Sequence, residues 1–179
     1  HSDLRRQRQM CIRDRKVVAP KSIKARPTTD FAKESLFNIL EHKIDYQGLE
    51  VLDLFAGTGN ISYEFISRGA EKVTSVDQAL SSYKFINSFA HENDMNIKCI
   101  KADVFKYLTK SGKSYPVIFA DPPYAIKHLE KIPDIIFENN WLEEGGLLIV
   151  EHGQETDFSG HERLVDQRVY SRVNFSFFE

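Results

Sequence analysis

Short apolar runs alternate with helix-like segments along the chain from Lys16 onward. Five of these runs have the length and composition of strands buried in a sheet. They cover residues 51–55, 72–76, 96–100, 116–120 and 147–151. Two further strand-like runs, 163–169 and 173–178, follow each other with no helix between them, and we expect them to pair antiparallel.

The segments between the strands carry helix signals. Thr28, Thr29 and Asp30 are candidate N-caps for a first helix. The apolar face expected for this helix is formed by Ala32, Leu36, Ile39 and Leu40. Further helices are expected over 61–68, 79–92, 103–108 and 127–139. Gly69 is the expected stop of the second helix, and Asp103 is the expected cap of the short one.

Strands that alternate with helices indicate a mostly parallel sheet covered on both faces. The predicted fold class is therefore α/β, a Rossmann-like sheet of seven strands with an antiparallel C-terminal pair. A chain of 179 residues fits one domain, which buries about 70% of its unfolded surface. We assign that domain to residues 16–179, with a basic N-terminal extension over residues 16–28.

Composition narrows the class of protein further. The chain is 41% hydrophobic and 28% charged, and no apolar run approaches the roughly 18 residues of a membrane span. It opens with no signal-peptide pattern. Cys11 and Cys99 are far apart and have no His or Cys at metal-ligand spacing. We expect a cytoplasmic monomer without a metal.

Positive charge is concentrated at the N-terminus. Residues 1–26 carry a net charge of +7 and leave −9 for the remainder, a distribution that suits a polyanionic partner. Residues 10–15 read MCIRDR, like a translated adapter end from a sequencing library, so we expect residues 1–15 to be a non-native leader. The candidate RNA-binding residues that remain are Lys16, Lys21 and Lys24.

A glycine turn follows the first predicted strand, in the segment VLDLFAGTGN. Gly57 and Gly59 would let the backbone turn tightly and approach a ligand, although a Gly-x-Gly turn alone is weak. Ser62 stands where a dinucleotide fingerprint wants a small packing residue, and Asp53 places a carboxylate under the turn. A carboxylate repels a pyrophosphate but attracts an ammonium group, which favours S-adenosylmethionine over NAD.

Two more acids follow the next strands. Asp77 ends the second strand, 18 residues after Gly59, where an acid can accept both ribose hydroxyls. Asp103 follows the third strand and can accept the adenine amino group. The predicted cofactor site also includes their neighbours Phe55 and Val104.

The fourth strand ends in Asp121-Pro122-Pro123-Tyr124. Pro122 and Pro123 have a fixed φ and no N–H group to continue the hydrogen bonds of the sheet, so we expect the segment after this strand to be rigid. Hydrogen bonds from an exocyclic amine to Asp121 and to the Pro122 carbonyl would localise the amine lone pair toward a methyl donor, and Tyr124 could stack on the base. In-line placement can contribute about 7–11 kcal/mol.

Together, VLDLFAGTGN, SVDQ, KADVF and ADPPY resemble the class I amino-methyltransferases. Arg26-Pro27-Thr28-Thr29 followed by KESLFN is similar to the bacterial 16S ribosomal RNA guanine-N2 methyltransferases of the guanine-966 type. The resemblance covers residue 16 to the C-terminus. It implies S-adenosylmethionine as cofactor, Arg26, Thr28 and Thr29 over the cofactor cleft, and a guanine of 16S rRNA or of a small-subunit assembly intermediate as substrate.

Other functions remain open at this point. A DNA or RNA adenine-N6 methyltransferase shares Asp-Pro-Pro-Tyr, but usually needs a target-recognition insert. A protein glutamine methyltransferase usually has Asn in place of Asp121 and an additional N-terminal domain. An NAD-dependent oxidoreductase is disfavoured by Asp53 and Ser62. A noncatalytic RNA-binding ribosome assembly factor would not need Asp121 and both prolines.

Overall fold

All seven strand-like runs of the sequence become neighbours in one sheet. The protein is described by a computed structural model over residues 9–12, 15–18, 20–23, 30–110 and 112–179, with the backbone alone at 9–12 and 15–17. From edge to edge the sheet contains β5 (Ile97–Lys101), β4 (Lys72–Asp77), β3 (Glu50–Leu54), β6 (Tyr115–Ala120), β7 (Leu142–His152), β9 (Val173–Phe178) and β8 (Leu164–Tyr170). The first five are parallel, and β9 is antiparallel to both of its neighbours. The predicted sheet is confirmed.

The strand order reverses between β3 and β6. The chain adds β4 and β5 on one side of β3 before it returns to place β6 on the other side. In open α/β sheets, ligands bind beyond the carboxyl ends of the strands at this kind of reversal. The segments that follow β3, β4 and β6 therefore border the expected ligand crevice.

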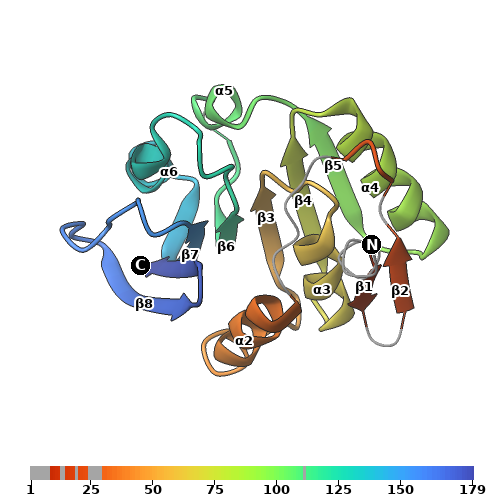
Figure 1. Ribbon diagram of the computed structural model, residues 1–179, viewed down its shortest axis with the longest axis horizontal. Helices are drawn as coiled ribbons and strands as arrows, with labels where there is room; N and C mark the ends of the chain where they lie inside the picture. The colour runs from red at the N-terminus through yellow and green to blue at the C-terminus, as the bar shows by residue number, and fades with distance from the viewer. Residues whose placement is uncertain (1–8, 13–14, 19, 24–29, 111) are drawn as a thin grey trace.

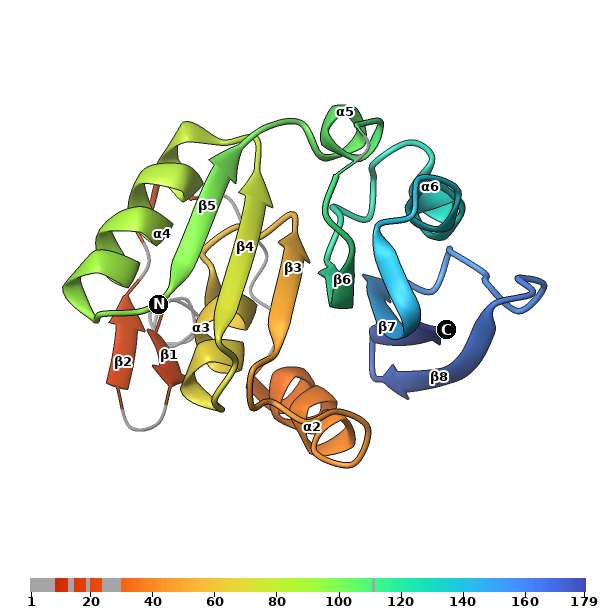
Figure 2. The same ribbon diagram turned by 180° about the vertical axis from the view of Figure 1, so that it is seen from behind.

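Helices cover both faces of the sheet (Figures 1 and 2). One face carries α2 (Asp30–Leu40), α3 (Asn60–Ser67) and α4 (Leu80–Glu92), and the other carries α5 (Val104–Leu108), the 3-10 turn η1 (Leu129–Lys131) and α6 (Ile132–Glu138). Alternate strand residues face opposite ways. Phe119 packs with the α2–α3 core, whereas Ile118 packs with the α5–α6 core. Burial on both faces explains why the strands read as continuous apolar runs.

The predicted helix over 127–139 is shorter than expected. His128 has a left-handed backbone (φ 66°), η1 follows it, and the α-helix begins only at Ile132 with Pro133 in its first turn. A proline has no N–H to donate, so it is accepted in a first turn but not in a helix interior. The α6 helix therefore starts five residues later than its apolar spacing indicates.

The start of β7 also differs from the sequence-based expectation. The β7 strand begins at Leu142 rather than 147, and Gly145 within it has a left-handed backbone (φ 72°). The ladder between β6 and β7 shifts register between Tyr115 and Val117, around Pro116, which cannot donate to it. Because Gly145 and Pro116 are not typical of a buried strand, the sequence pattern does not predict the first five residues of β7.

The N-terminal region forms a small antiparallel hairpin of β1 (Gln9–Ile12) and β2 (Arg15–Val18). The hairpin lies beside α3 and α4, and β1 contacts α3 (Figures 1 and 2). It includes residues of the expected leader, whose non-native origin stays a prediction. Within the described residues, no helix is long and apolar enough to cross a membrane.

Candidate active site

The turn after β3 requires glycine. Gly57 and Gly59 have φ values of 55° and 80°, in the left-handed region that side chains disfavour. A Cβ atom at Gly59 would lie 2.7 Å from the ring of Tyr63 and 2.9 Å from Ile86. The turn is therefore packed tightly onto α3 and α4. Phe55 also has a positive φ of 61°, a strained backbone of the kind that collects at functional sites.

Asp77 clamps this turn from the neighbouring strand. Its Oδ2 accepts the Gly57 N–H at 2.8 Å and its Oδ1 accepts the Ala79 N–H at 2.8 Å. An ionised carboxylate has about four acceptor positions, so two remain for hydroxyl groups of a ligand. The structure thus places Asp77 beside the glycine turn, as the sequence predicts.

Asp53 lies beneath the turn. It is only 1% exposed, and its Oδ2 accepts a hydrogen bond of 2.5 Å from Ser62 Oγ, which lies 2.7 Å from Ser75 Oγ. Burial raises the pKa of Asp53 to about 7, the Ser62 hydrogen bond opposes this rise, and the nearby Asp77 charge adds to it. The small side chain at position 62 therefore serves as a hydrogen-bond partner of the acid.

Asp103 and its neighbours flank the crevice beyond β5. The Asp103 Oδ1 accepts the Lys106 N–H at 2.9 Å, so the predicted helix cap is confirmed. The Val104 side chain is buried in the α5–α6 core. Its backbone N–H lies in the first turn of α5, where N–H groups have no partner within the helix, and is therefore the group that could bind a ligand. Phe105, which the sequence analysis did not select, stands edge-on to Phe55 with ring centroids 6.2 Å apart.

The Asp-Pro-Pro-Tyr segment leaves β6 on the other side of the strand reversal. The Asp121 N–H still donates to the Leu54 carbonyl of β3 at 3.3 Å, and Pro122, which is buried, ends the ladder. Tyr124 lies over the end of β7, where a Cβ atom on Gly153 would come within 3.1 Å of its ring. The Tyr124 hydroxyl donates to Glu151 Oε1 at 3.4 Å.

These strand ends bring most of the predicted site together. The glycine turn and Asp77 follow β3 and β4, and Asp121 follows β6, which is the neighbour of β3. Arg26, Thr28, Thr29 and Lys24 lie outside the described residues. Lys21 is exposed, and the side chain of Lys16 is not described. No group of three or more His, Cys, Asp or Glu within the described part could hold a metal.

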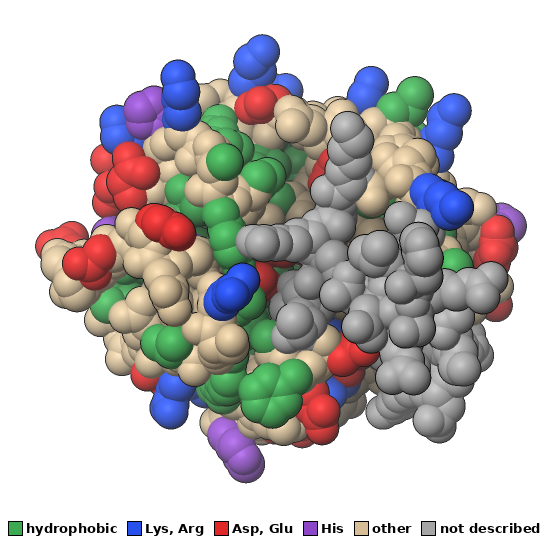
Figure 3. All heavy atoms as spheres, in the orientation of Figure 1, with side chains coloured by type: hydrophobic (Ala, Val, Ile, Leu, Met, Phe, Trp, Pro, Cys, Tyr) green, Lys and Arg blue, Asp and Glu red, His purple; other side chains and the backbone are tan. Residues whose placement is uncertain are grey.

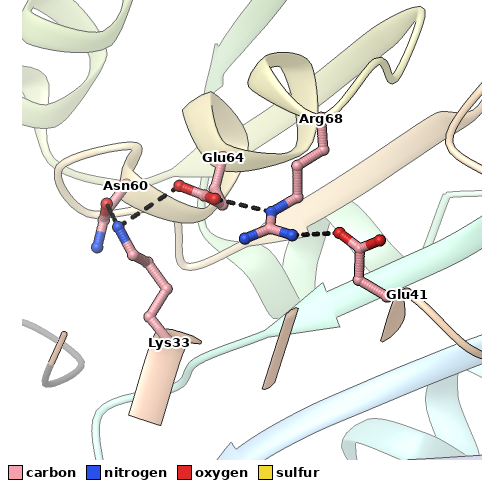
Figure 4. Close-up of polar contacts among 5 residues, drawn as sticks. All are labelled: Lys33, Glu41, Asn60, Glu64 and Arg68. Carbon is pink, nitrogen blue, oxygen red and sulfur yellow. Dashed lines mark hydrogen bonds and ion pairs between the residues drawn. The ribbon is translucent and has the colours of Figure 1, made fainter. Parts of the chain in front are cut away.

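A charged network that the sequence analysis missed joins α2 to the glycine turn (Figure 4). The Lys33 side chain is 7% exposed, and its Nζ donates to Asn60 Oδ1 at 3.2 Å and lies 3.6 Å from Glu64 Oε2. Arg68 then pairs with Glu64 at 2.7 Å and with Glu41. Asn60 directly follows Gly59, so the network holds the helix that carries the turn. Helical spacing from Lys33 to Phe37 and Leu40 could have revealed a lysine on the buried face.

The end of β7 was left without a role in the sequence analysis. His152 packs against Phe158 and lies 2.8 Å from Ser176 Oγ, and burial lowers its pKa. His152 is therefore structural. Glu151 points to the opposite face, is 3% exposed, and contacts Tyr124 as described above.

Comparison with known proteins identifies the family. A family described as Conserved hypothetical protein 95 matches residues 11–179. The Ribosomal RNA small subunit methyltransferase D of Escherichia coli (strain K12) is 33% identical over 141 residues, which are 78% of this chain and 70% of that protein. The chain belongs to the ribosomal RNA small subunit methyltransferase D family.

Other members and neighbours agree on the fold. A methyltransferase D of Buchnera aphidicola is 31% identical over 127 residues, 70% of this chain but only 64% of that relative. The solved structure of yhhF from Escherichia coli has a TM-score of 0.83 at 26% identity and covers 95% of this chain and 97% of its own. The family fold thus extends over almost the whole chain.

Two further matches carry different substrate names. A Methanocaldococcus jannaschii protein named for N5-glutamine methylation is 31% identical over 154 residues, 86% of this chain and 69% of its own. The 16S rRNA N2 G1207 methyltransferase RsmC of T. thermophilus, solved with AdoMet and guanosine, has a TM-score of 0.70 at 19% identity and covers 96% of this chain and 49% of its own. The methyltransferase D family therefore shares its sheet with enzymes of several substrate classes.

Proposed function

We propose that this protein transfers a methyl group from S-adenosylmethionine to the exocyclic N2 of a guanine in 16S ribosomal RNA. The observation that carries the proposal is the position of the Asp121-Pro122 edge at the strand reversal, beside the clamped glycine turn. The glycine turn on the β3 side of the reversal suits a cofactor, and the Asp121-Pro122 edge on the β6 side suits an amine. The two meet between β3 and β6.

The residues fit S-adenosylmethionine better than a dinucleotide. Asp77 offers carboxylate oxygens to ribose hydroxyls beside a turn in which Gly59 leaves no room for a side chain. Asp103 flanks the adenine position, and Phe55 with Phe105 forms an aromatic wall near it. Asp53 adds carboxyl oxygens beneath the turn, and its pKa of about 7 leaves it partly ionised near neutral pH. This set of acceptors attracts hydroxyl, amino and ammonium groups, whereas a pyrophosphate would meet repulsion.

When bound, the cofactor supplies a methyl group on a positively charged sulfur. A carbon–N2 bond would form as the carbon–sulfur bond breaks, and the proton that N2 then loses would pass to the Asp121 carboxylate. The side chain of Asp121 and the carbonyl of Pro122 accept the N2 hydrogen atoms and aim the nitrogen lone pair. Tyr124 stacks on the base, which is worth about 1–3 kcal/mol. The two prolines keep this edge fixed, because neither can rotate about φ.

The comparisons support an RNA substrate. The Escherichia coli and Buchnera relatives are named for methylation of small-subunit ribosomal RNA. The fold that this chain shares with RsmC is one that holds AdoMet and guanosine. An Asp at position 121 also favours a base amine over a glutamine amide, whose methyltransferases usually carry Asn there.

Replacing Asp121 by Ala tests the mechanism. We expect S-adenosylmethionine binding to survive, because Asp77 and the glycine turn that would hold it are unchanged, while methyl transfer falls by at least about 100-fold through lost alignment. Glu138, an exposed acid at the end of α6, provides a matched control as Glu138→Ala. Calorimetry with the cofactor and transfer of labelled methyl groups to 30S subunits measure the two effects. Normal transfer by the Asp121 variant would exclude this mechanism.

The same assay separates the alternative functions. Label recovered as N2-methylguanine supports the proposal, label on adenine N6 or on a protein glutamine assigns another acceptor, and binding without label transfer assigns a noncatalytic assembly factor. Subunits from cells that lack the activity serve as substrate, and mapping of the labelled base identifies the nucleotide.

A further inference from the structure

Glu151 lies beside Asp121 at the carboxyl end of the sheet. The parallel register pairs Val117 with Leu147 and Ala120 with Val150, so the next residues along β6 and β7 are Asp121 and Glu151. Past the end of β6, the Asp121 N–H still donates to the Leu54 carbonyl of β3, so Asp121 stays aligned with the sheet. The two carboxyl-bearing residues therefore occupy equivalent positions on adjacent strands.

Both positions lie on the same face of the sheet. Phe119 and Ile149, two residues earlier, pack in the core beneath α2 and α3, whereas Ala120 and Val150 pack in the core beneath α5 and α6. Side chains alternate along strands. This alternation places the acids at 121 and 151 together above the α2–α3 core, where the crevice opens.

The Glu151 carboxyl group is held at a defined position. It is 3% exposed, and its Oε1 accepts the hydrogen bond from the Tyr124 hydroxyl at 3.4 Å. Tyr124 in turn rests on Gly153, two residues further along the same strand segment. The ring expected to stack on the base thus also orients this carboxyl group, and an ionised carboxylate can only accept hydrogen bonds.

We propose that Glu151 selects guanine by accepting the N1–H of the base, while Asp121 and the Pro122 carbonyl hold the N2 amino group. This inference rests on the proposed function. The edge of guanine presents hydrogen atoms at both N1 and N2, which match two adjacent acceptors. Adenine presents a lone pair at N1, which a carboxylate repels. A site built to bind a hydrogen atom rejects the analogue that lacks it, because a buried carboxylate oxygen then faces a lone pair instead of a donor.

The test uses 2-aminopurine, which keeps the reactive amino group of guanine but has a lone pair at N1. A 16S RNA fragment carries guanine or 2-aminopurine at the mapped position, and kcat/KM is measured for each. The wild-type protein should prefer guanine by about 10- to 100-fold. Equal use of the two fragments by the wild type would overturn the inference without the need for any variant.

Glu151→Gln and Glu151→Ala identify the residue responsible. Gln is close in shape and can donate to N1 of 2-aminopurine, so the preference should fall at least about tenfold, and Ala should also lower it toward equality. Glu144→Gln, an exposed acid near the other end of β7, should keep the wild-type ratio. A structural role alone would slow both substrates equally, so an unchanged ratio in a folded Glu151 variant would refute the assignment. A wild type that methylates neither fragment instead contradicts the proposed function.

Discussion

Asp53 is a buried acid whose ionisation is opposed by its surroundings. Desolvation raises its pKa from 3.8 to about 7, even though Ser62 donates a short hydrogen bond to it. The folded protein therefore holds a proton at Asp53 that the unfolded chain releases. The free energy of unfolding then decreases as the pH rises from about 4 to about 7, and this contribution is constant above that window.

Replacing Asp53 by Asn should remove this pH dependence. The amide stays neutral and can still accept from Ser62, so the variant should gain stability over the wild type as the pH rises through the window. The gain should be on the order of a few kcal/mol at pH 8 and close to zero at pH 4. Urea unfolding of both proteins at the two pH values measures it. A difference that does not change with pH would mean that Asp53 titrates normally.

Single residues show where sequence reasoning works and where it stops. The acids after β4 and β5 could be located because strand ends and glycine turns have local signatures. The structure then shows that Asp77 and Asp103 bind backbone N–H groups as well. Glu151 has no local signature, because its relation to Asp121 depends on the register of two strands whose paired residues are 30 positions apart in sequence.

At the scale of elements, α2 is fastened to α3 by a partly buried ionic network. Lys33 reaches across to Asn60 and Glu64, and Arg68 continues the chain of contacts to Glu41 (Figure 4). Charges removed from water need partners to be tolerated. Because Asn60 begins α3 directly after the glycine turn, the position of α2 and the shape of the turn are connected.

Replacing Lys33 by Met should weaken both stability and cofactor binding. The variant loses the hydrogen bond from Lys33 to Asn60, and we expect the free energy of unfolding to fall by about 1–3 kcal/mol. The loss is limited because Met fills similar space and Glu64 remains paired with Arg68. The dissociation constant for S-adenosylmethionine should rise, since Asn60 loses its partner. Lys33→Arg keeps a positive charge at this position and should lose less cofactor affinity than Lys33→Met. Denaturation and calorimetry measure the two effects. An exposed control, Lys43→Met, should change neither, and unaltered cofactor affinity in Lys33→Met would show that α2 does not support the turn.

Most elements could be predicted because their signals are local. Apolar runs, Asp103 as a cap and Gly69 as a stop each act over a few residues, and apart from the start of β7 the structure confirms them within two residues. The errors occur where backbone geometry overrides composition. Pro133 delays α6, and Gly145 with Pro116 obscures the start of β7.

At the scale of the whole molecule, basic side chains occur on the side where a ligand would enter. Lys and Arg side chains follow the upper edge of the view in Figure 3, the edge at which α5 lies in Figure 1. Lys84 and Lys106 are exposed on the segments that follow β4 and β5, and Lys101 is exposed at the end of β5. A surface hollow of about 530 Å³ also lies between Pro20, Ser22 and the first half of α4.

Replacing Lys16, Lys21 and Lys24 together by Ala should weaken binding to 16S RNA fragments and flatten its salt dependence, because phosphate contacts and the release of their counterions are lost. Each lost contact to single-stranded RNA lowers the slope of log K against log salt by about 0.7. The control replaces Lys43, which follows α2, together with Lys72 and Lys113, which lie at the amino ends of β4 and β6, and should keep the wild-type slope. Fluorescence anisotropy of a labelled fragment between about 50 and 200 mM salt gives both slopes. Equal slopes for the two triple variants would place the RNA away from the basic extension.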